Sequence, residues 1–304
     1  MKRFGSLLLA LVVTLTMSFS VVTVASFAEE QKASATTVVS IQKGDTVKGT
    51  VDLSTAKLKK YTYSFINNAG TVKKESVKGV TVKSLLDKYK VKVKKNQAVE
   101  FVCGGSKPGS ITFNYSDLFG TRYCYKSITK LNADKGIAST KKAKKAKKAK
   151  VAPVIAVEAD SNGENCLRLY FGQKYITERN MPLFYDHVEA IKVVPAVEKK
   201  VNNDPIFATE SKVAVGTTLE FDVSKVKNDY IYYTVNGKKP TVNNARIYNY
   251  APKATPAAFN KYKFKKTGTY TVKAVVKSCC NTSSKVVTKK IKVVKELPTT
   301  DETK

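Results

Sequence analysis

The side chains that could perform chemistry are few and lie far apart in the sequence. The 304-residue chain has one histidine, His187, and no C-x-x-C motif among its five cysteines. No nucleophile-elbow pattern accompanies the histidine, so Ser-His-Asp or Cys-His catalysis has no support. Asp117, Glu158 and Glu178 show no spacing that would pair them as general acid and base. We therefore interpret these four residues as structural and predict neither a catalytic residue nor a metal site.

The five cysteines indicate possible disulfides, although an odd number leaves at least one thiol free or paired between chains. Cys103 and Cys124 flank an expected hairpin, and a bridge between them would close a short loop worth about 3 kcal/mol. They are our disulfide candidate. The adjacent Cys279 and Cys280 could bridge only through a strained vicinal ring, so we interpret them as two buried thiols.

The N-terminus has the pattern of a secretory signal peptide. Lys2 and Arg3 precede an apolar run from Leu7 to Val24, and Ala28 follows with small residues at the positions that a signal peptidase requires. We predict a signal peptide over residues 1–28 and a secreted, extracellular protein, with association to the cell envelope as an option. A retained membrane anchor is the alternative. No later segment is apolar enough to cross a bilayer.

The charge is strongly positive. Lys and Arg number 54 against 24 Asp and Glu, a net charge of +30, and only five of the basic residues are Arg. Lysine is a flexible point charge that lacks the bidentate geometry with which arginine reads bases. This composition disfavours sequence-specific nucleic-acid recognition.

Composition divides the chain into two parts. Residues 36–197 alternate strand-like and helix-like patterns, 198–205 form a polar linker, 206–295 contain strand patterns only, and 296–304 are a tail. Apolar residues at 82, 85, 86 and 89 predict one short helix, which Thr81 could cap. Alternation at 61–65, 99–103 and 111–115 predicts strands, and Val154–Val157 predicts a strand covered on both faces.

Five motifs in the first part occur in the order typical of one family. They are Gly79–Leu86, Val99-Glu100-Phe101, Pro153–Ala156, Leu167-Arg168-Leu169 and Ile191-Lys192-Val193. Together they resemble the molybdopterin-binding domain of the sulfite oxidase family over residues 40–194. The resemblance implies a strand-rich α+β fold and, in that family, a redox enzyme.

The cofactor positions of that family are degenerate in this chain. Ser64, in the segment Ser64-Phe65-Ile66-Asn67, stands where the family has the cysteine that binds molybdenum. Molybdenum is a soft metal and prefers a sulfur ligand. Asp186 and His187 replace a basic position, and a carboxylate there would repel a cofactor phosphate. We therefore expect no cofactor, and treat Ser64, Asn67, Asp186 and His187 as degenerate positions.

The second part resembles a different family. The segment Ile231–Thr241 is similar to the signature of the chitobiase/β-hexosaminidase C-terminal domain, which implies an all-β immunoglobulin-like sandwich and a role in spacing or attachment. The tyrosines Tyr232, Tyr233 and Tyr250 could stack on sugar, although alternating tyrosines in a strand more often belong to the core. A glycan is thus a second class of partner.

A lysine-rich loop over residues 126–150 is the most distinctive segment. Its end carries seven lysines, Lys141, Lys142, Lys144, Lys145, Lys147, Lys148 and Lys150, spaced by alanines. Such a tract attracts phosphate-bearing polymers without sequence preference. The alternative interpretation is a solubilising expansion that has no partner.

These patterns favour a secreted, non-catalytic binding or scaffold protein of the envelope of a Gram-positive bacterium. Its expected partner is an anionic cell-wall polymer or another polyanion, bound through lysine-rich surfaces. The alternatives are a molybdopterin-dependent oxidoreductase and a carbohydrate-binding accessory module. The first predicts molybdenum in the purified protein, and the second predicts retention on chitin or peptidoglycan in about 0.5 M salt, where charges are screened.

Overall fold

Strands make up nearly all of the regular structure. The computed structural model describes residues 37–66, 72–104, 108–125, 147–226, 229–248 and 261–297. In these residues there are two α-helices, α1 (Val82–Lys88) and α2 (Tyr115–Leu118), and one 3-10 turn, η2 (Met181–Leu183). Both helices are short, and the strands fall into several small sheets. The prediction of an α+β domain with the sulfite-oxidase-type fold is therefore wrong.

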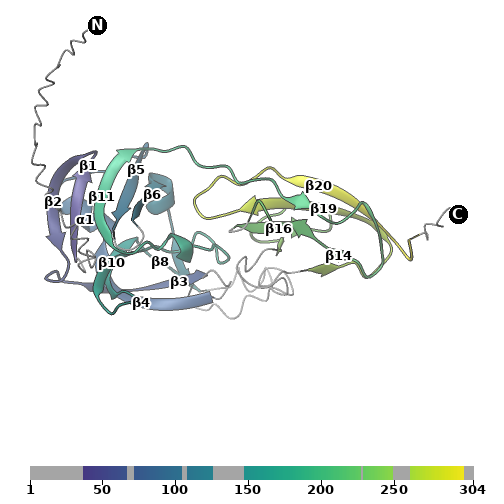
Figure 1. Cartoon of the computed structure of the whole chain (residues 1–304), viewed down its shortest axis with the longest axis horizontal. Coiled ribbons are helices and arrows are strands. Elements are labelled where there is room, and N and C mark those ends of the chain that lie inside the picture. Colours follow the sequence, from purple (N-terminus) through teal and green to yellow (C-terminus); the bar gives the residue numbers. More distant parts are fainter. Residues whose placement is uncertain are drawn as a thin grey trace, which may run out of the picture. The chain divides into compact units, whose positions relative to one another are not determined.

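Two sheets form the main part of the described residues between 37 and 197 (Figure 1). The first has the order β2-β1-β11-β5-β6, with β1 (Val38–Lys43), β2 (Thr46–Asp52), β5 (Gln97–Cys103), β6 (Gly109–Asn114) and β11 (Val188–Pro195). The second has the order β10-β9-β4-β3, with β3 (Lys59–Ile66), β4 (Val72–Thr81), β9 (Val154–Ala159) and β10 (Asn165–Tyr170). A two-stranded ladder joins β7 (Tyr123–Tyr125) to β8 (Lys148–Lys150).

The apolar strand at Val154–Val157 lies where its sequence predicts. It falls within β9, which pairs with β10 on one side and with β4 on the other. The side chains of Val154, Ile155 and Ala156 are fully buried. Gly79 of β4 lies opposite Ala156, and a Cβ at that glycine would stand 2.3 Å from the carbonyl oxygen of Ile155. Glycine thus allows these two strands to approach closely.

The short helix is also confirmed. Helix α1 buries Val82, Leu85 and Leu86, the face that the sequence spacing predicts. The hydroxyl of Thr81 accepts a hydrogen bond from the backbone N–H of Ser84 at 3.1 Å, so this residue is the expected N-cap. The helix ends after two turns, and the chain then leads into β5.

The described part of the chain after residue 205 forms strands only. They are β12 (Ile206–Phe207), β13 (Lys212–Ala214), β14 (Thr218–Leu219), β15 (Phe221–Asp222), β16 (Tyr230–Thr234), β17 (Arg246–Ile247), β18 (Tyr262–Lys263), β19 (Gly268–Lys277) and β20 (Val287–Val294). Five of these strands form a sheet in the order β13-β20-β19-β16-β17. The other pairs are short, and nothing in them identifies an immunoglobulin-like sandwich.

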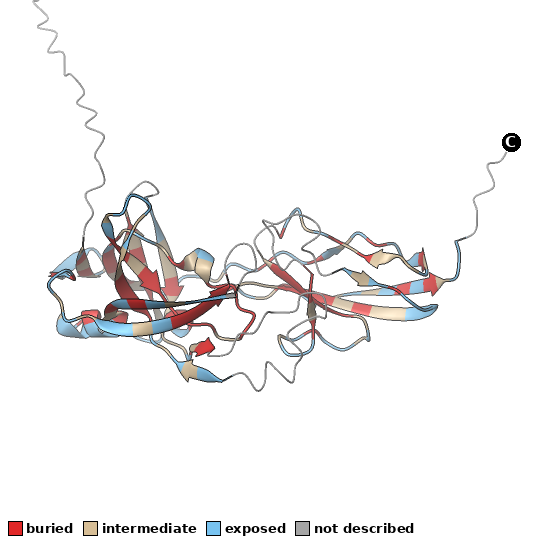
Figure 2. Cartoon of the chain, turned by 90° about the horizontal axis from the view of Figure 1, so that it is seen from below, coloured by how far each residue is buried: buried red, intermediate tan, exposed pale blue. Residues whose placement is uncertain are grey.

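All five residues of strand β16 are buried, and Figure 2 colours the described chain by burial. Ile231 and Tyr233 point into a core that includes Val272 and Ile291. On the opposite face, Tyr230 and Tyr232 pack in a second cluster. Tyr232 and Tyr233 are therefore core residues, and neither is exposed for stacking on a sugar.

Several predicted features lie outside the described residues. These are the signal peptide (1–28), Asn67, Tyr250, most of the lysine-rich loop and the end of the tail. The division of residues 36–197 from 206–295 stays a prediction, because the described residues all belong to one compact unit, Ala35–Lys304. None of the helices within the described ranges has the length and apolar character needed to span a membrane.

Candidate functional site

Ser64 has a structural role in the second sheet. Its hydroxyl donates a hydrogen bond to Oε1 of Gln173 at 2.7 Å and accepts one from the backbone N–H of Tyr125 at 2.9 Å. The side chain is fully buried. Ser64 therefore connects β3 to β7 and to the segment after β10, with both functions of its hydroxyl used by the chain itself.

Asp186 and His187 belong to a different set of contacts. His187 lies just before β11 with φ of +52°, and its Nε2 is 3.4 Å from Oδ2 of Asp160. Its Nδ1 is 3.5 Å from Oδ1 of Asp186. Hydrogen bonds from the backbone of Glu164 and Asn162 lower the pKa of Asp160, and His187 adds to this effect. Ser64 thus contacts Gln173 and Tyr125, whereas His187 contacts Asp160 and Asp186, so these degenerate positions belong to two separate sets of contacts among the described residues.

The predicted Cys103–Cys124 bridge is not formed. Cys103 ends β5 and Cys124 lies in β7, two strands of different sheets. The expected hairpin does exist between β5 and β6, but it closes before the chain reaches Cys124. Burial, together with nearby Asp186 and Glu189, raises the pKa of Cys103 to about 12. The proposed disulfide is thus corrected to two separately buried sulfurs.

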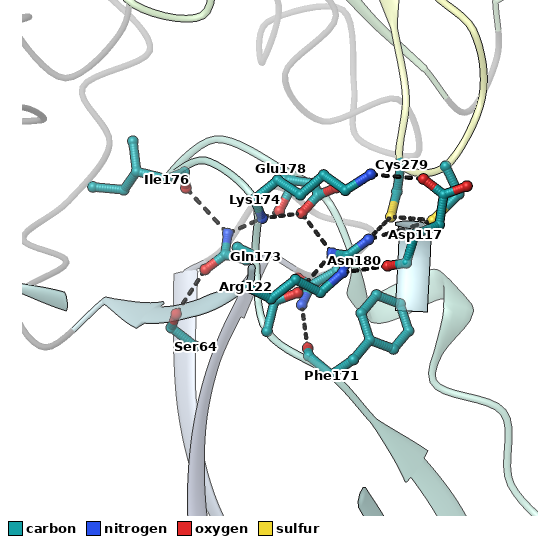
Figure 3. Close-up of polar contacts among 12 residues, drawn as sticks. Ser64, Asp117, Arg122, Phe171, Gln173, Lys174, Ile176, Glu178, Asn180 and Cys279 are labelled. Atoms are coloured by element: carbon teal, nitrogen blue, oxygen red, sulfur yellow. Dashed lines mark hydrogen bonds and ion pairs between the residues drawn. The ribbon is translucent and has the colours of Figure 1, made fainter. Parts of the chain in front are cut away.

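We call the buried side chains of Arg122, Glu178 and Asp117, together with Lys174 and Lys199, the Arg122 cluster. Figure 3 labels four of these residues, Asp117, Arg122, Lys174 and Glu178. Arg122 and Glu178 each have a side-chain exposure of 1%, and Nη1 of Arg122 is 3.0 Å from Oε2 of Glu178. Arg122 also donates to the backbone oxygens of Asp117 at 2.6 Å and Gly172 at 2.8 Å. Its guanidinium carbon lies 4.8 Å from the ring centre of Phe171. Burial lowers the pKa of Arg122, but Glu178, Cys279 and Cys280 together outweigh it, and the net shift is upward.

Asp117 forms a second ion-paired centre beside Arg122. Its carboxylate, 2% exposed, is 2.6 Å from Nζ of Lys174 and 2.8 Å from Nζ of Lys199. Burial raises the pKa of Asp117, but hydrogen bonds from the two lysines more than offset this and lower it. Asp117 and Glu178 are therefore each paired with cations of the chain itself.

The lowered pKa of Asp117 predicts that the free energy of unfolding falls in acid. Because the folded pKa lies below the unfolded value of about 3.9, the ion pair contributes its full stability above about pH 4 and loses it as pH falls through the folded pKa. In urea titrations from pH 6 to pH 2.5, the wild type should lose stability more steeply than Asp117→Asn, by up to about 1.4 kcal/mol per pH unit. Asp87→Asn, at an exposed ion pair, should follow the wild type. Parallel curves for the wild type and Asp117→Asn would contradict the assignment.

Only part of the predicted lysine tract is described. Lys141, Lys142, Lys144 and Lys145 lie outside the described residues, whereas Lys147, Lys148 and Lys150 lie within them. Strand β8 pairs with β7, and Nζ of Lys148 stands 4.0 Å from the ring centre of Tyr123. The end of the tract is thus anchored to the fold by a short strand and a cation–π contact.

A second group of lysines, absent from the sequence prediction, lies on the five-stranded sheet. We call it the lysine face, and its members are Lys212, Lys273, Lys290 and Lys292. Lys212 of β13 is directly opposite Lys292 of β20. Lys290 lies opposite Thr271 of β19, two residues from Lys273. Because Val213, Val272, Ile291 and Val293 point to the core, alternation places these four lysines together on the other face.

A cleft adjoins helix α1 and the end of the lysine tract. Its volume is about 650 Å³, and its lining includes Leu86, Val91 and Phe119. Lys83, Lys92 and Lys150 also line it, together with Asp87. Lys83 is paired with Asp87 across one helical turn. The cleft is thus an apolar depression with a positively charged border.

The described residues contain no group of three or more His, Cys, Asp or Glu side chains that could hold a metal ion. Their cationic surfaces can attract anions, and their buried ion pairs stabilise the fold.

In comparisons with known proteins, no family model matches the chain and no curated protein matches it.

Proposed function

We propose that this chain is an exported, non-catalytic binding protein that attaches to phosphate-bearing polymers of the bacterial cell envelope through its lysine-rich surfaces. The observation that carries the proposal is the lysine face. Lys212 and Lys292 stand in direct register on neighbouring strands, and like charges so placed repel each other. A bound polyanion would relieve that repulsion.

The charge around the lysine face supports this role. Among the described residues, the lysines that form ion pairs with carboxylates are Lys83, Lys174, Lys192, Lys199 and Lys261, and none of them belongs to the lysine face. Its four ammonium groups are therefore available to an external anion. The net charge of +30 adds a long-range attraction for such a partner.

The residue type indicates what kind of polymer would bind. Lysine binds phosphate as a point charge, whereas arginine recognises it bidentately. Binding by lysine clusters is therefore tolerant of sequence and spacing and strongly dependent on salt. A teichoic acid, which is a phosphodiester polymer outside the cell, fits both this chemistry and the export pattern at residues 1–28.

Sedimentation with isolated Gram-positive cell walls tests the proposal. We expect the full chain to bind walls that carry teichoic acid at about 50 mM salt and to be released by about 0.5 M salt, where the screening length shortens to a few ångströms. Walls from which acid has removed the teichoic acid should bind far less. Equal binding to both preparations, or retention in about 0.5 M salt, would reject this function and favour a glycan partner.

A further inference from the structure

The two adjacent cysteines lie in the loop that joins β19 to β20. Cys279 is buried and Cys280 is half-buried, and their Sγ atoms are 3.1 Å apart. Successive side chains of an extended strand point to opposite faces, which would separate two neighbouring thiols. Here Cys280 has a φ of +70°, a conformation that is uncommon outside glycine and asparagine. This backbone turn accompanies the close approach of the two thiols.

We propose that Cys279 and Cys280 form a redox-active dithiol that is reversibly oxidised to a vicinal disulfide by a disulfide oxidant. The inference is independent of polyanion binding. It revises the sequence interpretation of two ordinary buried thiols, because the sulfurs already face each other and the backbone is already turned.

Arg122 distinguishes the two sulfurs. Its Nη2 is 3.6 Å from Sγ of Cys280 and 3.9 Å from Sγ of Cys279. The hydrogen bond from Cys279 lowers the pKa of Cys280, and the charge of Arg122 lowers it further. Burial and the charges of Glu178 and Asp117 raise this pKa, but the net shift is downward. Burial raises the pKa of Cys279. Because the thiolate is the nucleophile, Cys280 is the residue that attacks first.

The reaction balances as two successive exchanges. The Cys280 thiolate attacks a disulfide R–S–S–R, forms a mixed disulfide with one sulfur and releases the other as a thiolate. Cys279 then loses its proton and attacks Sγ of Cys280, which forms the vicinal disulfide and releases the second thiolate. The two cysteines lose two electrons and two protons, and the oxidant is reduced to two thiols.

The product should be easily reduced. Neighbouring Cα atoms are about 3.8 Å apart across a trans peptide bond, below the usual range for disulfides of about 4.4–6.8 Å. Strained disulfides have more oxidising potentials and belong to the labile class. We therefore expect oxidation only in an oxidising environment and rapid reversal by a dithiol reductant.

Peptide mass spectrometry of the native full chain tests the proposal. The protein is incubated with glutathione disulfide, blocked with N-ethylmaleimide and digested with trypsin, which releases residues 278–285 with both cysteines. We expect this peptide to be lighter than the dithiol form by two hydrogen atoms and to carry no maleimide. Reduction with dithiothreitol before blocking should yield a peptide with two maleimides. A peptide that carries two maleimides after incubation with glutathione disulfide would show that both thiols stayed reduced, and this result would overturn the proposal.

Two single variants separate the roles of the sulfurs. In Cys279→Ser, the reaction should stop at a glutathione adduct on Cys280. In Cys280→Ser, Cys279 should stay unmodified over the same time because it is buried and lacks the lowered pKa. Equal adduct formation in both variants would contradict the assigned order, and circular dichroism checks that each variant is folded. The wild-type result decides on disulfide formation even if a variant fails to fold.

Discussion

Glu178→Gln is expected to lower the free energy of unfolding by about 3–5 kcal/mol, the usual cost of breaking a buried ion pair by removing one partner. The substitution keeps the shape of the side chain and removes its charge. Arg122 then remains buried with no carboxylate hydrogen-bonded to it, since its other acceptors are the backbone oxygens of Asp117 and Gly172 and the two neighbouring cysteine sulfurs. A buried charge without a counterion is the largest penalty that one substitution in the Arg122 cluster can introduce.

Urea denaturation followed by circular dichroism measures this effect, and the chain supplies a matched control. Lys83 and Asp87 form an ion pair across one turn of α1, with side-chain exposures of 72% and 54%. Asp87→Asn removes a charge in the same way but at the surface, so it should cost less than about 1 kcal/mol. A loss below about 1 kcal/mol for Glu178→Gln would show that the Arg122 charge reaches water or another anion, contrary to the observed burial.

Local structure was predictable wherever it depends on neighbouring residues. The spacing of Val82, Leu85 and Leu86 predicted α1, and Thr81 caps it as expected. The alternation around Phe101 and Phe113 predicted the hairpin of β5 and β6. The spacing of apolar residues shows which side of an element faces the core, and this spacing can be seen within a few consecutive residues.

The fold class could not be obtained in the same way. The five motifs matched elements that do exist at their positions, but their order does not specify which strands pair. Strand β1 pairs in parallel with β11, about 150 residues later, and β4 pairs with β9 across the whole lysine-rich loop. Packing between segments that lie far apart in the sequence determines these strand partners. A resemblance based on short segments carries no information about that packing.

The Arg122 cluster was missed for the same reason. Asp117 and Glu178 were interpreted as scattered carboxylates because no local spacing pairs them with one another or with a cation. Their partners are Lys174, Lys199 and Arg122, and Glu178 lies 56 residues from Arg122. One available signal was composition, since Arg122 is one of only five arginines in a chain whose other basic residues are lysines. Arginine is the cation best suited to burial with a carboxylate.

The lysine face was also missed, although a pattern for it existed. In β20 the sequence Lys290-Ile291-Lys292-Val293 alternates lysine with apolar residues, which predicts one charged and one buried face. Strand alternation alone does not indicate that Lys212 would stand opposite Lys292, because β13 and β20 pair across about 80 residues. The lysine face exists only after that pairing forms.

This pairing leads to the second large expected effect, on polyanion binding. Lys290→Glu together with Lys292→Glu replaces two of the four positive charges of the lysine face. Binding to single-stranded polyphosphates follows the salt concentration with a log–log slope of about −0.7 per neutralised phosphate. The double variant should therefore flatten the slope by about 1.4. If affinity at 1 M salt is unchanged, this corresponds to about 70-fold weaker binding at about 50 mM salt.

Fluorescence anisotropy with a labelled oligothymidylate, a phosphodiester polymer without base pairing, measures the slope from about 50 to about 300 mM salt. The control is Lys43→Glu with Lys48→Glu, which changes the net charge by the same amount at exposed positions around the turn between β1 and β2. If the lysine face is the contact, the control keeps the wild-type slope and loses affinity only modestly, through the reduced long-range attraction. If both double variants change equally, net charge alone governs binding and the lysine face has no special part in it. The comparison thus separates a localised site, which the register of β13 and β20 creates, from the diffuse attraction of any protein with this charge.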